Sequence, residues 1–399
     1  MDLTPTPRAA EIVERFRCFL EEEVLRAESA HEQWRAGGPR PGAESPVLVE
    51  LKAEARERGL WNLGLRSASG LTHLDYAPIA ELAGRSPELA PAAINAAPPD
   101  SVNMVMLDAV ASTEQRRRWL DPLLSDEFRS AFAMTEPEVS SSDATNIATT
   151  IEWDGDAYVV NGRKWYITGA ANPRCAVLFV VGRSDPTAPP HRRHSLVVVP
   201  TDAPGVRVVR SLPVFGYDGD QAEITFSDVR VPAENLLGER GRGFAVGQTR
   251  LAAARLQHCM RTVGLSERAL EMTCRRAMSR VAFGRSLARQ GTLRSELAAS
   301  RIALDRTRLL IQHTAALVDR DGATAAQANI SAAKVLTMRT AMEVIERAIS
   351  VHGALGLSDD VPLARWWALV RGLHIADGPE EVHLEVVARH ELRAAESSS

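Results

Sequence analysis

The fold class is most readily inferred from the segment YVVNGRKWYIT, residues 158–168, near the middle of the chain. β-Branched and aromatic residues flank Asn161-Gly162, and both of these residues tolerate positive φ, so the pattern predicts a two-residue hairpin turn. Trp165 and Tyr166 would then point to opposite faces of one strand, where one ring could meet a flat heterocycle while the other packs inward. Ordinary core and edge packing is the alternative explanation of such a pair.

More β-rich runs follow this segment, and each is bounded by Pro, Gly or Asp. They comprise residues 177–181, 195–199, 206–209 and 223–231. Because no helical pattern separates these runs, we expect an antiparallel sandwich or barrel over residues 129–240, and a parallel Rossmann sheet is excluded.

Helical patterns lie on both sides of the β-region. Apolar side chains recur at helical spacing from Ile12 to Leu25, ahead of a breaker cluster at 37–42, and a second stripe runs from Ile330 to Ile349 and stops at Gly353. The predicted fold is α+β and mainly helical: an N-terminal helical domain (1–128), a central antiparallel β-domain (129–240) and a C-terminal four-helix bundle (241–399). Shorter N-terminal helices are expected over 46–59, 74–83, 101–111 and 114–124.

Length and composition narrow the functional classes. The chain has 399 residues, enough for two or three packed regions. Its 47 Lys plus Arg against 51 Asp plus Glu give a net charge of −4, which provides no electrostatic footprint for nucleic acid. The four cysteines form no CxxC pair, so the common metal and redox motifs are excluded. We expect a cytoplasmic protein, because the N-terminus lacks signal-peptide features and the longest apolar run, 176–181, is too short to span a membrane.

A hydroxyl-rich turn precedes the β-runs. It consists of FAMTEP, residues 132–137, followed by SSSD, residues 140–143. Hydroxyls and backbone N–H groups in such a turn suit an anionic ligand. A solvent-facing loop leading into the sheet is the more common origin of this composition.

Two further segments carry residues suited to ligand binding. Arg280 and Phe283, with Gln290 close behind, lie at a helix end, where an Arg can neutralise a phosphate while a ring stacks on a base; a solvated helix end explains them equally well. Near the C-terminus, Gly378 suits a cap and Pro379 the first position of a helix, with acidic residues in its first turn. Asp377 would lie on the turn before that helix, in a functional or a purely structural role.

Together, in this order and spacing, these segments resemble the acyl-CoA dehydrogenase family over nearly the whole chain. The resemblance rests on the TEP and SD turn, the NGxKxxIT pattern, the Arg-x-x-Phe-Gly segment and the C-terminal turn. Residues 141–146, 351–353 and 376–383 look most like the branch whose members are often fused to a small-molecule-kinase-like domain and handle long-chain or 4-hydroxylated acyl groups. No kinase domain is present in these 399 residues.

The resemblance implies an FAD enzyme of fatty acid β-oxidation. It implies an acyl-CoA substrate, an electron-transfer flavoprotein as electron acceptor, and a homodimer or homotetramer with FAD at the subunit interface. Nucleic acid and a membrane span are not expected. The implied substrate contacts are Ser142, Arg255 and Gly378. The implied FAD contacts are Phe132, Met134, Thr135, Ser142, Trp165, Tyr166, Thr168, Arg280, Phe283, Gln290, Ser350, Gly353, Ala354, Pro379 and Glu381.

The implied reaction removes two hydrogens from adjacent carbons of the acyl thioester. A carboxylate takes the α-proton while the flavin accepts the β-hydride, and the backbone N–H of the base residue helps to stabilise the enolate oxygen. Most members carry Glu-Gly at the C-terminal turn, whereas this chain has Asp377-Gly378. The family's other base position matches Ala254, which cannot accept a proton, so Asp377 is the remaining candidate. Burial in a dry pocket is expected to raise its pKa.

The chain departs from the family pattern at two more positions, and the same fold also supports other activities. Ser350 and Ala354 replace a Gln and a Gly that are common in the FAD-contacting loop. The same scaffold also serves nitroalkane oxidases, which use an aspartate base, and acyl-CoA oxidases. The non-enzymatic alternative is a catalytically silent flavoprotein scaffold.

Overall fold

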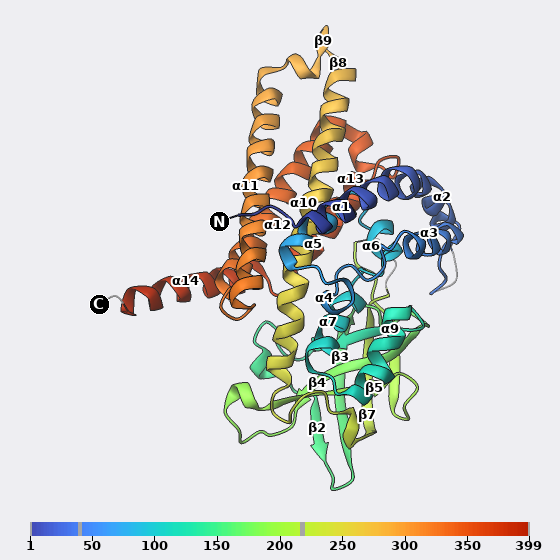
Figure 1. Ribbon diagram of the computed structural model, residues 1–399, viewed down its shortest axis with the longest axis vertical. Coiled ribbons are helices and arrows are strands. Elements are labelled where there is room, and N and C mark those ends of the chain that lie inside the picture. Colours follow the sequence, from blue (N-terminus) through green and yellow to red (C-terminus); the bar gives the residue numbers. More distant parts are fainter. Residues whose placement is uncertain (1, 39–41, 216–219, 398–399) are drawn as a thin grey trace.

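We describe the protein from a computed structural model, which covers residues 2–38, 42–215 and 220–397. Figure 1 shows a β-domain at one end, long helices running away from it, and the N-terminal helices packed beside them. The breaker cluster predicted at 37–42 lies partly outside the described residues. The helix before it ends at Ala36, as expected. In the described part of the chain, no helix combines the length and apolarity needed to cross a membrane.

The N-terminal region is helical, as predicted. Its first two helices are joined by one π-helical turn (Leu20–Val24), and Thr6 and Ser45 cap the starts of α1 and α3 through their side-chain oxygens. A second π-helical turn (Arg116–Leu120) joins α8 to α9. The helices are α1 (Pro7–Phe19), α2 (Leu25–Ala36), α3 (Pro46–Glu57), α4 (Arg66–Ser69), α5 (His73–Gly84), α6 (Leu89–Ala93), α7 (Asp100–Val110), α8 (Thr113–Gln115) and α9 (Asp121–Ser125).

The central region forms a seven-stranded sheet in the order β1-β4-β2-β3-β7-β6, with β5 paired to β4. Most pairs are antiparallel, but β4 pairs in parallel with both β1 and β2, so the prediction of a wholly antiparallel domain was wrong around β4. β1 precedes the predicted β-runs in the sequence and follows α9 directly. The strands are β1 (Arg129–Ala133), β2 (Thr150–Trp153), β3 (Ala157–Ile167), β4 (Cys175–Arg183), β5 (His194–Pro200), β6 (Val206–Ser211) and β7 (Ala222–Pro232).

The hairpin predicted at Asn161-Gly162 was wrong, because β3 runs straight through both residues. The Asn161 side chain instead pairs with Asp228 on β7: its Oδ1 accepts from the Asp228 N–H at 2.7 Å, and its Nδ2 donates to Oδ1 at 3.1 Å. Gly162 is needed for close approach, since a Cβ there would lie 2.4 Å from the Thr149 hydroxyl. The real turn is at 154–156, between β2 and β3, where Gly155 has φ 103°.

Trp165 and Tyr166 do not point to opposite faces, which corrects the second expectation for this strand. Tyr166 has φ 50°, and the β3–β7 register shifts between Lys164 and Ile167. The irregularity brings the two rings together, with centroids 4.9 Å apart and a 58° tilt. Tyr166 is exposed and Trp165 is half-buried. Both rings therefore remain available to one ligand on the same side of the sheet.

The C-terminal region contains long helices and one small hairpin. α10 runs from the β-domain to the hairpin β8–β9 at the far end of the molecule, and α11 returns alongside it (Figure 1). α12 ends at His352, before Gly353, as predicted. The elements are α10 (Gly243–Ser279), β8 (Val281–Ala282), β9 (Arg285–Ser286), α11 (Gly291–Asp321), α12 (Gln327–His352), α13 (Leu363–Ile375) and α14 (Glu380–Ser397).

Two glycines allow α5 and α10 to touch backbone to backbone. A Cβ at Gly84 would lie 1.8 Å from the Arg261 carbonyl oxygen, and one at Gly264 would lie 1.7 Å from the Glu81 carbonyl oxygen. Both helices belong to one large apolar core that also includes α1, α11 and α12. The middle of α10, which carries several of the site residues below, is thereby fixed against the N-terminal helices.

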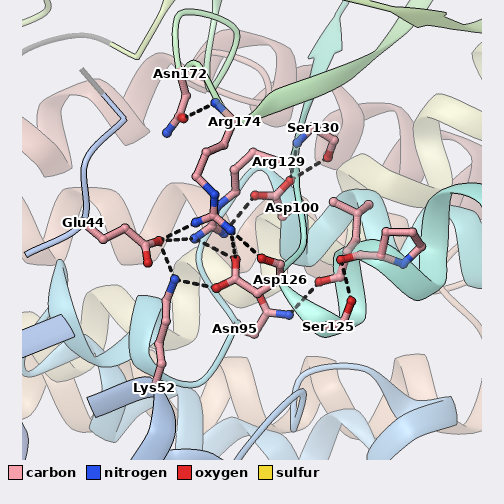
Figure 2. Close-up of polar contacts among 12 residues, drawn as sticks. Glu44, Lys52, Asn95, Asp100, Ser125, Asp126, Arg129, Ser130, Asn172 and Arg174 are labelled. Carbon is pink, nitrogen blue, oxygen red and sulfur yellow. Dashed lines mark hydrogen bonds and ion pairs between the residues drawn. The ribbon is translucent and has the colours of Figure 1, made fainter. Parts of the chain in front are cut away.

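A buried charge network joins the N-terminal helices to the sheet (Figure 2). Lys52 on α3 donates to Glu44 at 2.5 Å and to Asp126 at 2.6 Å, and its side chain is 4% exposed. Arg129 and Arg174, from the β-domain, bind the same two carboxylates. Two carboxylates, Glu44 and Asp126, thus form ion pairs with three cations at the boundary between the helices and the sheet. The pKa of Asp126 is lowered, because these cations outweigh its burial.

We expect Lys52→Met to lower the free energy of unfolding by about 3 kcal/mol, because two partly buried carboxylates lose a close, buried cation while their arginines remain. Chemical denaturation followed by circular dichroism measures the change. Glu50→Met, an exposed substitution on the same helix, is the control and should change stability by no more than about 0.5 kcal/mol. Equal stability of the two variants would show that the Lys52 ion pairs contribute nothing.

Candidate active site

Asp377 lies on a sharp turn between the last two helices. α13 ends at Ile375 and α14 begins at Glu380. Asp377 has φ 56° and Gly378 has φ 107°, and a left-handed conformation costs a residue with a side chain about 1–2 kcal/mol. Pro379 stands just before the helix, not at its first position as expected, and its carbonyl accepts the first helical hydrogen bond from Val382. Such strain persists only where surrounding groups hold the turn.

Cationic side chains hold three successive carbonyls of this turn. Arg255 donates from Nε to the Asp377 carbonyl at 2.9 Å. Lys334, on α12, donates to the Ala376 carbonyl and, at 3.2 Å, to the Gly378 carbonyl. Lys334 is 3% exposed, and burial lowers its pKa to about 8. The backbone N–H of Asp377 makes no hydrogen bond to any described group.

His383 supports the turn from below. Its ring is 2% exposed and contacts Ser331, with Nδ1 3.1 Å from the hydroxyl. A Cβ at Gly378 would lie 3.1 Å from its Nε2, so the glycine accommodates both the ring and the positive φ. Burial lowers the pKa of His383 to about 4, so this ring is neutral near pH 7. Its role here is to shape the turn.

The Asp377 carboxylate is largely enclosed and faces basic side chains. Its side chain is 15% exposed, and Oδ2 lies 3.4 Å from Nε2 of His258. Burial alone would raise the pKa of Asp377, but His258, Arg250, Lys334 and Arg255 together lower it below the usual value. The expectation of a raised pKa was therefore wrong, because it considered burial without these neighbours. Asp377 is ionised at neutral pH and can accept a proton.

The predicted flavin contacts of the β-domain come together where the ends of β1 and β3 meet, which we call the sheet edge. The Trp165 N–H donates to the Thr135 carbonyl at 3.0 Å, which ties β3 to the segment after β1. Phe132, Met134 and Thr135 are half-buried, and Thr168 is exposed. The hydroxyls of Thr135 and Thr168 make no hydrogen bond to described residues, so both are free to bind a ligand.

Lys164 and Glu136, which the sequence analysis did not select, fix this edge. Lys164 is 0% exposed and donates at 2.8 Å each to Glu136 Oε1 and to the carbonyls of Met134 and Val181. Glu136 in turn accepts from the N–H groups of Ala148 and Thr149. The pair thus holds the backbone of the segment that carries Met134 and Thr135.

Ser142 is exposed and makes no hydrogen bond within the described part of the chain, whereas the neighbouring Ser141 hydroxyl accepts from the Glu136 N–H at 3.0 Å. The serine turn is therefore tied to the sheet through Ser141, with Ser142 left on the surface. This arrangement is compatible with the predicted contact of Ser142 to FAD or CoA.

Arg250 was also missed, and it connects the two halves of the site. It lies on α10, is 8% exposed, and places its guanidinium 4.4 Å from the centroid of the Phe132 ring. Its Nε donates at 2.6 Å to Asn103, whose amide donates to Ser130 at 2.8 Å. Arg250, His258 and Arg261 recur at helical spacing along a mostly buried helix, and that polar face was the available sequence signal.

The remaining predicted contacts lie elsewhere in the chain. Arg280, Phe283 and Gln290 surround the β8–β9 hairpin, at the end of α10 opposite the β-domain (Figure 1). Phe283 is 99% exposed. Within one chain these residues do not meet Trp165 or Tyr166, so a role at FAD requires a neighbouring chain. The exposed contacts predicted at the ends of α12 and α14 are Ser350, Gly353, Ala354 and Glu381.

Comparisons with known proteins identify the class. Models of the acyl-CoA dehydrogenase middle domain and C-terminal domain match residues 131–229 and 241–392. The chain belongs to the acyl-CoA dehydrogenase family, flavoprotein oxidoreductases of fatty acid metabolism that act on CH–CH groups and use FAD.

Individual relatives support the predicted branch. The chain is 49% identical to "Probable acyl-CoA dehydrogenase FadE2" of Mycobacterium tuberculosis, over 100% of this chain and 98% of that protein. It is 44% identical to "Acyl-CoA dehydrogenase family member 11" of Mus musculus, over 97% of this chain but only 50% of that longer protein. A solved acyl-CoA dehydrogenase from Geobacillus kaustophilus superposes with a TM-score of 0.80 at 27% identity, covering 96% of this chain and 98% of that one.

The residues at the sheet edge fit FAD. Two adjacent aromatic rings, at Trp165 and Tyr166, are joined there by the hydroxyls of Thr135 and Thr168, which make no hydrogen bond to a described residue. This donor set suits a flat heterocycle with polar edges. Among the described residues, no cluster of His, Cys, Asp and Glu suits a metal ion.

Proposed function

We propose that this acyl-CoA dehydrogenase converts a medium- to long-chain acyl-CoA to the trans-2-enoyl-CoA, with Asp377 as the base that takes the α-proton. The observation that carries the proposal is an ionised, enclosed carboxylate on a turn whose carbonyls are held by Arg255 and Lys334. Ala254 cannot serve at the alternative position. The branch resemblance adds 4-substituted acyl chains to the candidate substrates.

The chain's residues divide the work of the reaction. Asp377 accepts the α-proton through its carboxylate, and its free backbone N–H is available to the enolate oxygen. Arg255 and Lys334 keep both groups in place. FAD, when bound, supplies the oxidation by accepting the β-hydride, and Thr135, Trp165, Tyr166 and Thr168 would hold its ring. We propose that the electrons leave to an electron-transfer flavoprotein.

In this proposal, the FAD site is complete only in an oligomer. Arg280, Phe283 and Gln290 would complete the FAD site of a neighbouring chain in a homodimer or homotetramer. The nearly complete exposure of Phe283 is compatible with this arrangement, because the ring is accessible to a neighbouring chain.

The test is anaerobic addition of acyl-CoAs of graded length, with and without a 4-hydroxyl group, to the FAD-loaded protein. Bleaching of the flavin absorbance with formation of the 2-enoyl product supports the proposal, and the length that bleaches fastest identifies the substrate class. Turnover with an artificial electron acceptor, without hydrogen peroxide in air, distinguishes a dehydrogenase from an oxidase. Absence of bleaching by every acyl-CoA would contradict the proposal.

The pH dependence of kcat/KM follows from two groups of the free enzyme. Because its basic neighbours hold the pKa of Asp377 below its usual value, the carboxylate is ionised at neutral pH, and we expect no acid loss of activity from it between pH 5 and 8. Lys334 holds the carbonyls of the turn most strongly while it is protonated, so activity should fall as pH rises through about 8. Stopped-flow measurement across pH 5–9.5 checks that activity stays constant on the acid side and falls on the alkaline side. Lys334→Met should remove the alkaline limb at a lower overall rate.

A further inference from the structure

We propose that His258 is a positioning residue for the base: its Nε2–H restrains Oδ2 of Asp377 and leaves Oδ1 to receive the substrate proton. This inference rests on the proposed role of Asp377. His258 lies on α10, on the same helix as Arg255, and its side chain is 12% exposed. The carboxylate and the imidazole thus face each other across the boundary between α10 and the C-terminal turn.

Arg261 determines which nitrogen of His258 carries the proton. Its Nη2 lies 3.1 Å from Nδ1 of His258, and a guanidinium can only donate. Nδ1 must therefore accept, which places the single proton of a neutral ring on Nε2, the nitrogen that faces Asp377. Arg261 is itself held by a hydrogen bond from Nη1 to the Ala96 carbonyl at 3.0 Å.

The ring is neutral under working conditions. Burial, and then the charge of Arg261, lower the pKa of His258 to about 3, although Asp377 acts in the opposite direction. The other cations facing the ring are Lys334, on α12, and Arg250, on α10. A protonated imidazole would bind the carboxylate too tightly for it to act as a base, whereas a neutral N–H orients it and leaves it basic.

The orientation of the carboxyl group matters here because Asp377 has a shorter side chain than the Glu that most family members carry at this turn. The clamps from Arg255 and Lys334 hold the backbone of the turn but not the rotation of the carboxyl group. At 3.4 Å the Nε2 to Oδ2 contact is long in this structure, as catalytic contacts often are before substrate binds, and it should tighten when the site closes. This contact with His258 Nε2 is the one polar side-chain contact to the carboxyl group itself among the described residues.

The test compares His258→Leu with His258→Gln in the FAD-loaded protein. Leu has no donor, whereas Gln places an amide N–H near the position of Nε2. We expect Leu to slow anaerobic flavin reduction at saturating acyl-CoA about tenfold, with unchanged FAD content and KM, and to move the acid limb to higher pH. Gln should restore most of the rate. His313→Leu, on α11, is the matched control and should behave as wild type.

Two results would overturn the inference: His258→Leu with a wild-type rate and pH profile, or His258→Gln as slow as His258→Leu. Asp377→Asn, measured in parallel, separates the two proposals. If Asp377→Asn is inactive and His258→Leu is not slowed, only the positioning role fails; if Asp377→Asn still reduces its flavin, both fail. If His258→Leu does not fold, Arg261→Met is the test variant. Without Arg261 the proton of His258 can lie on either ring nitrogen, so flavin reduction should slow about threefold. A wild-type rate in Arg261→Met would overturn the inference.

Discussion

Asp377→Asn loses flavin reduction by acyl-CoA, by a factor of about 10⁴, while retaining FAD and binding substrate. The side chain keeps its size, but its amide cannot take up a proton, and no other described carboxylate stands at either base position of the family. A positioned general base is worth roughly 10²–10⁴ in rate, and this one has no substitute. Anaerobic stopped-flow absorbance with saturating acyl-CoA measures the effect.

The control for this substitution is Asp359→Asn, an exposed aspartate on the loop before α13, which should reduce its flavin at the wild-type rate. Flavin absorbance and a substrate-analogue titration confirm that the variant site is intact. Rapid bleaching by Asp377→Asn would exclude Asp377 as the base and direct attention to another group beside Trp165.

Lys164→Met has the largest expected effect on stability. It leaves Glu136, 3% exposed, without its cation, and a buried charge stripped of its partner typically costs 3–5 kcal/mol. The pKa of Glu136 is lowered: burial would raise it, but Lys164 and the hydrogen bonds from Thr149 and Ala148 outweigh that effect. We expect the unfolding free energy to fall by about 4 kcal/mol and FAD content to drop, because the segment carrying Met134 and Thr135 loses its anchor.

The double variant Lys164→Met/Glu136→Gln tests the cause. Removing both charges leaves no unpaired ion, so most of the lost stability should return, whereas the carbonyls of Met134 and Val181 stay without their donor. Thermal unfolding and bound-FAD absorbance of the single and double variants separate the two contributions. Equal loss in both would show that Lys164 acts through the carbonyls alone.

Long periodic patterns predicted the elements well, and short motifs predicted them poorly. The stripe that ends at Gly353 gave the end of α12, and the runs at 177–181 and 195–199 became β4 and β5. Asn161-Gly162 failed because strand pairing with β7 overrides a local turn preference, and the Asn161 side chain bonds Asp228 instead of closing a turn. Local propensity is a weak prior wherever tertiary pairing is available.

The candidate site could be predicted only in part for a similar reason. Asp377 and its turn are visible in a local motif, but Arg255 and Lys334 come from helices more than 40 residues away in sequence, and nothing local indicates that they converge. Besides the polar face of α10, the composition offered one more signal. The chain contains only three lysines, Lys52, Lys164 and Lys334, among 47 basic residues, and each proves to be a buried cation with at least two partners.

The burial of all three lysines has a practical consequence. Amine-acylating reagents should find no accessible ε-amino group on the folded chain, because every one is enclosed and engaged in hydrogen bonds. The arginines that make up the rest of the positive surface do not react with them. Acylation of these three lysines would therefore report local opening of the protein. Reaction at Lys52 would report opening of the boundary between the N-terminal helices and the sheet. Reaction at Lys164 would report opening of the sheet edge, and reaction at Lys334 opening of the turn that carries Asp377.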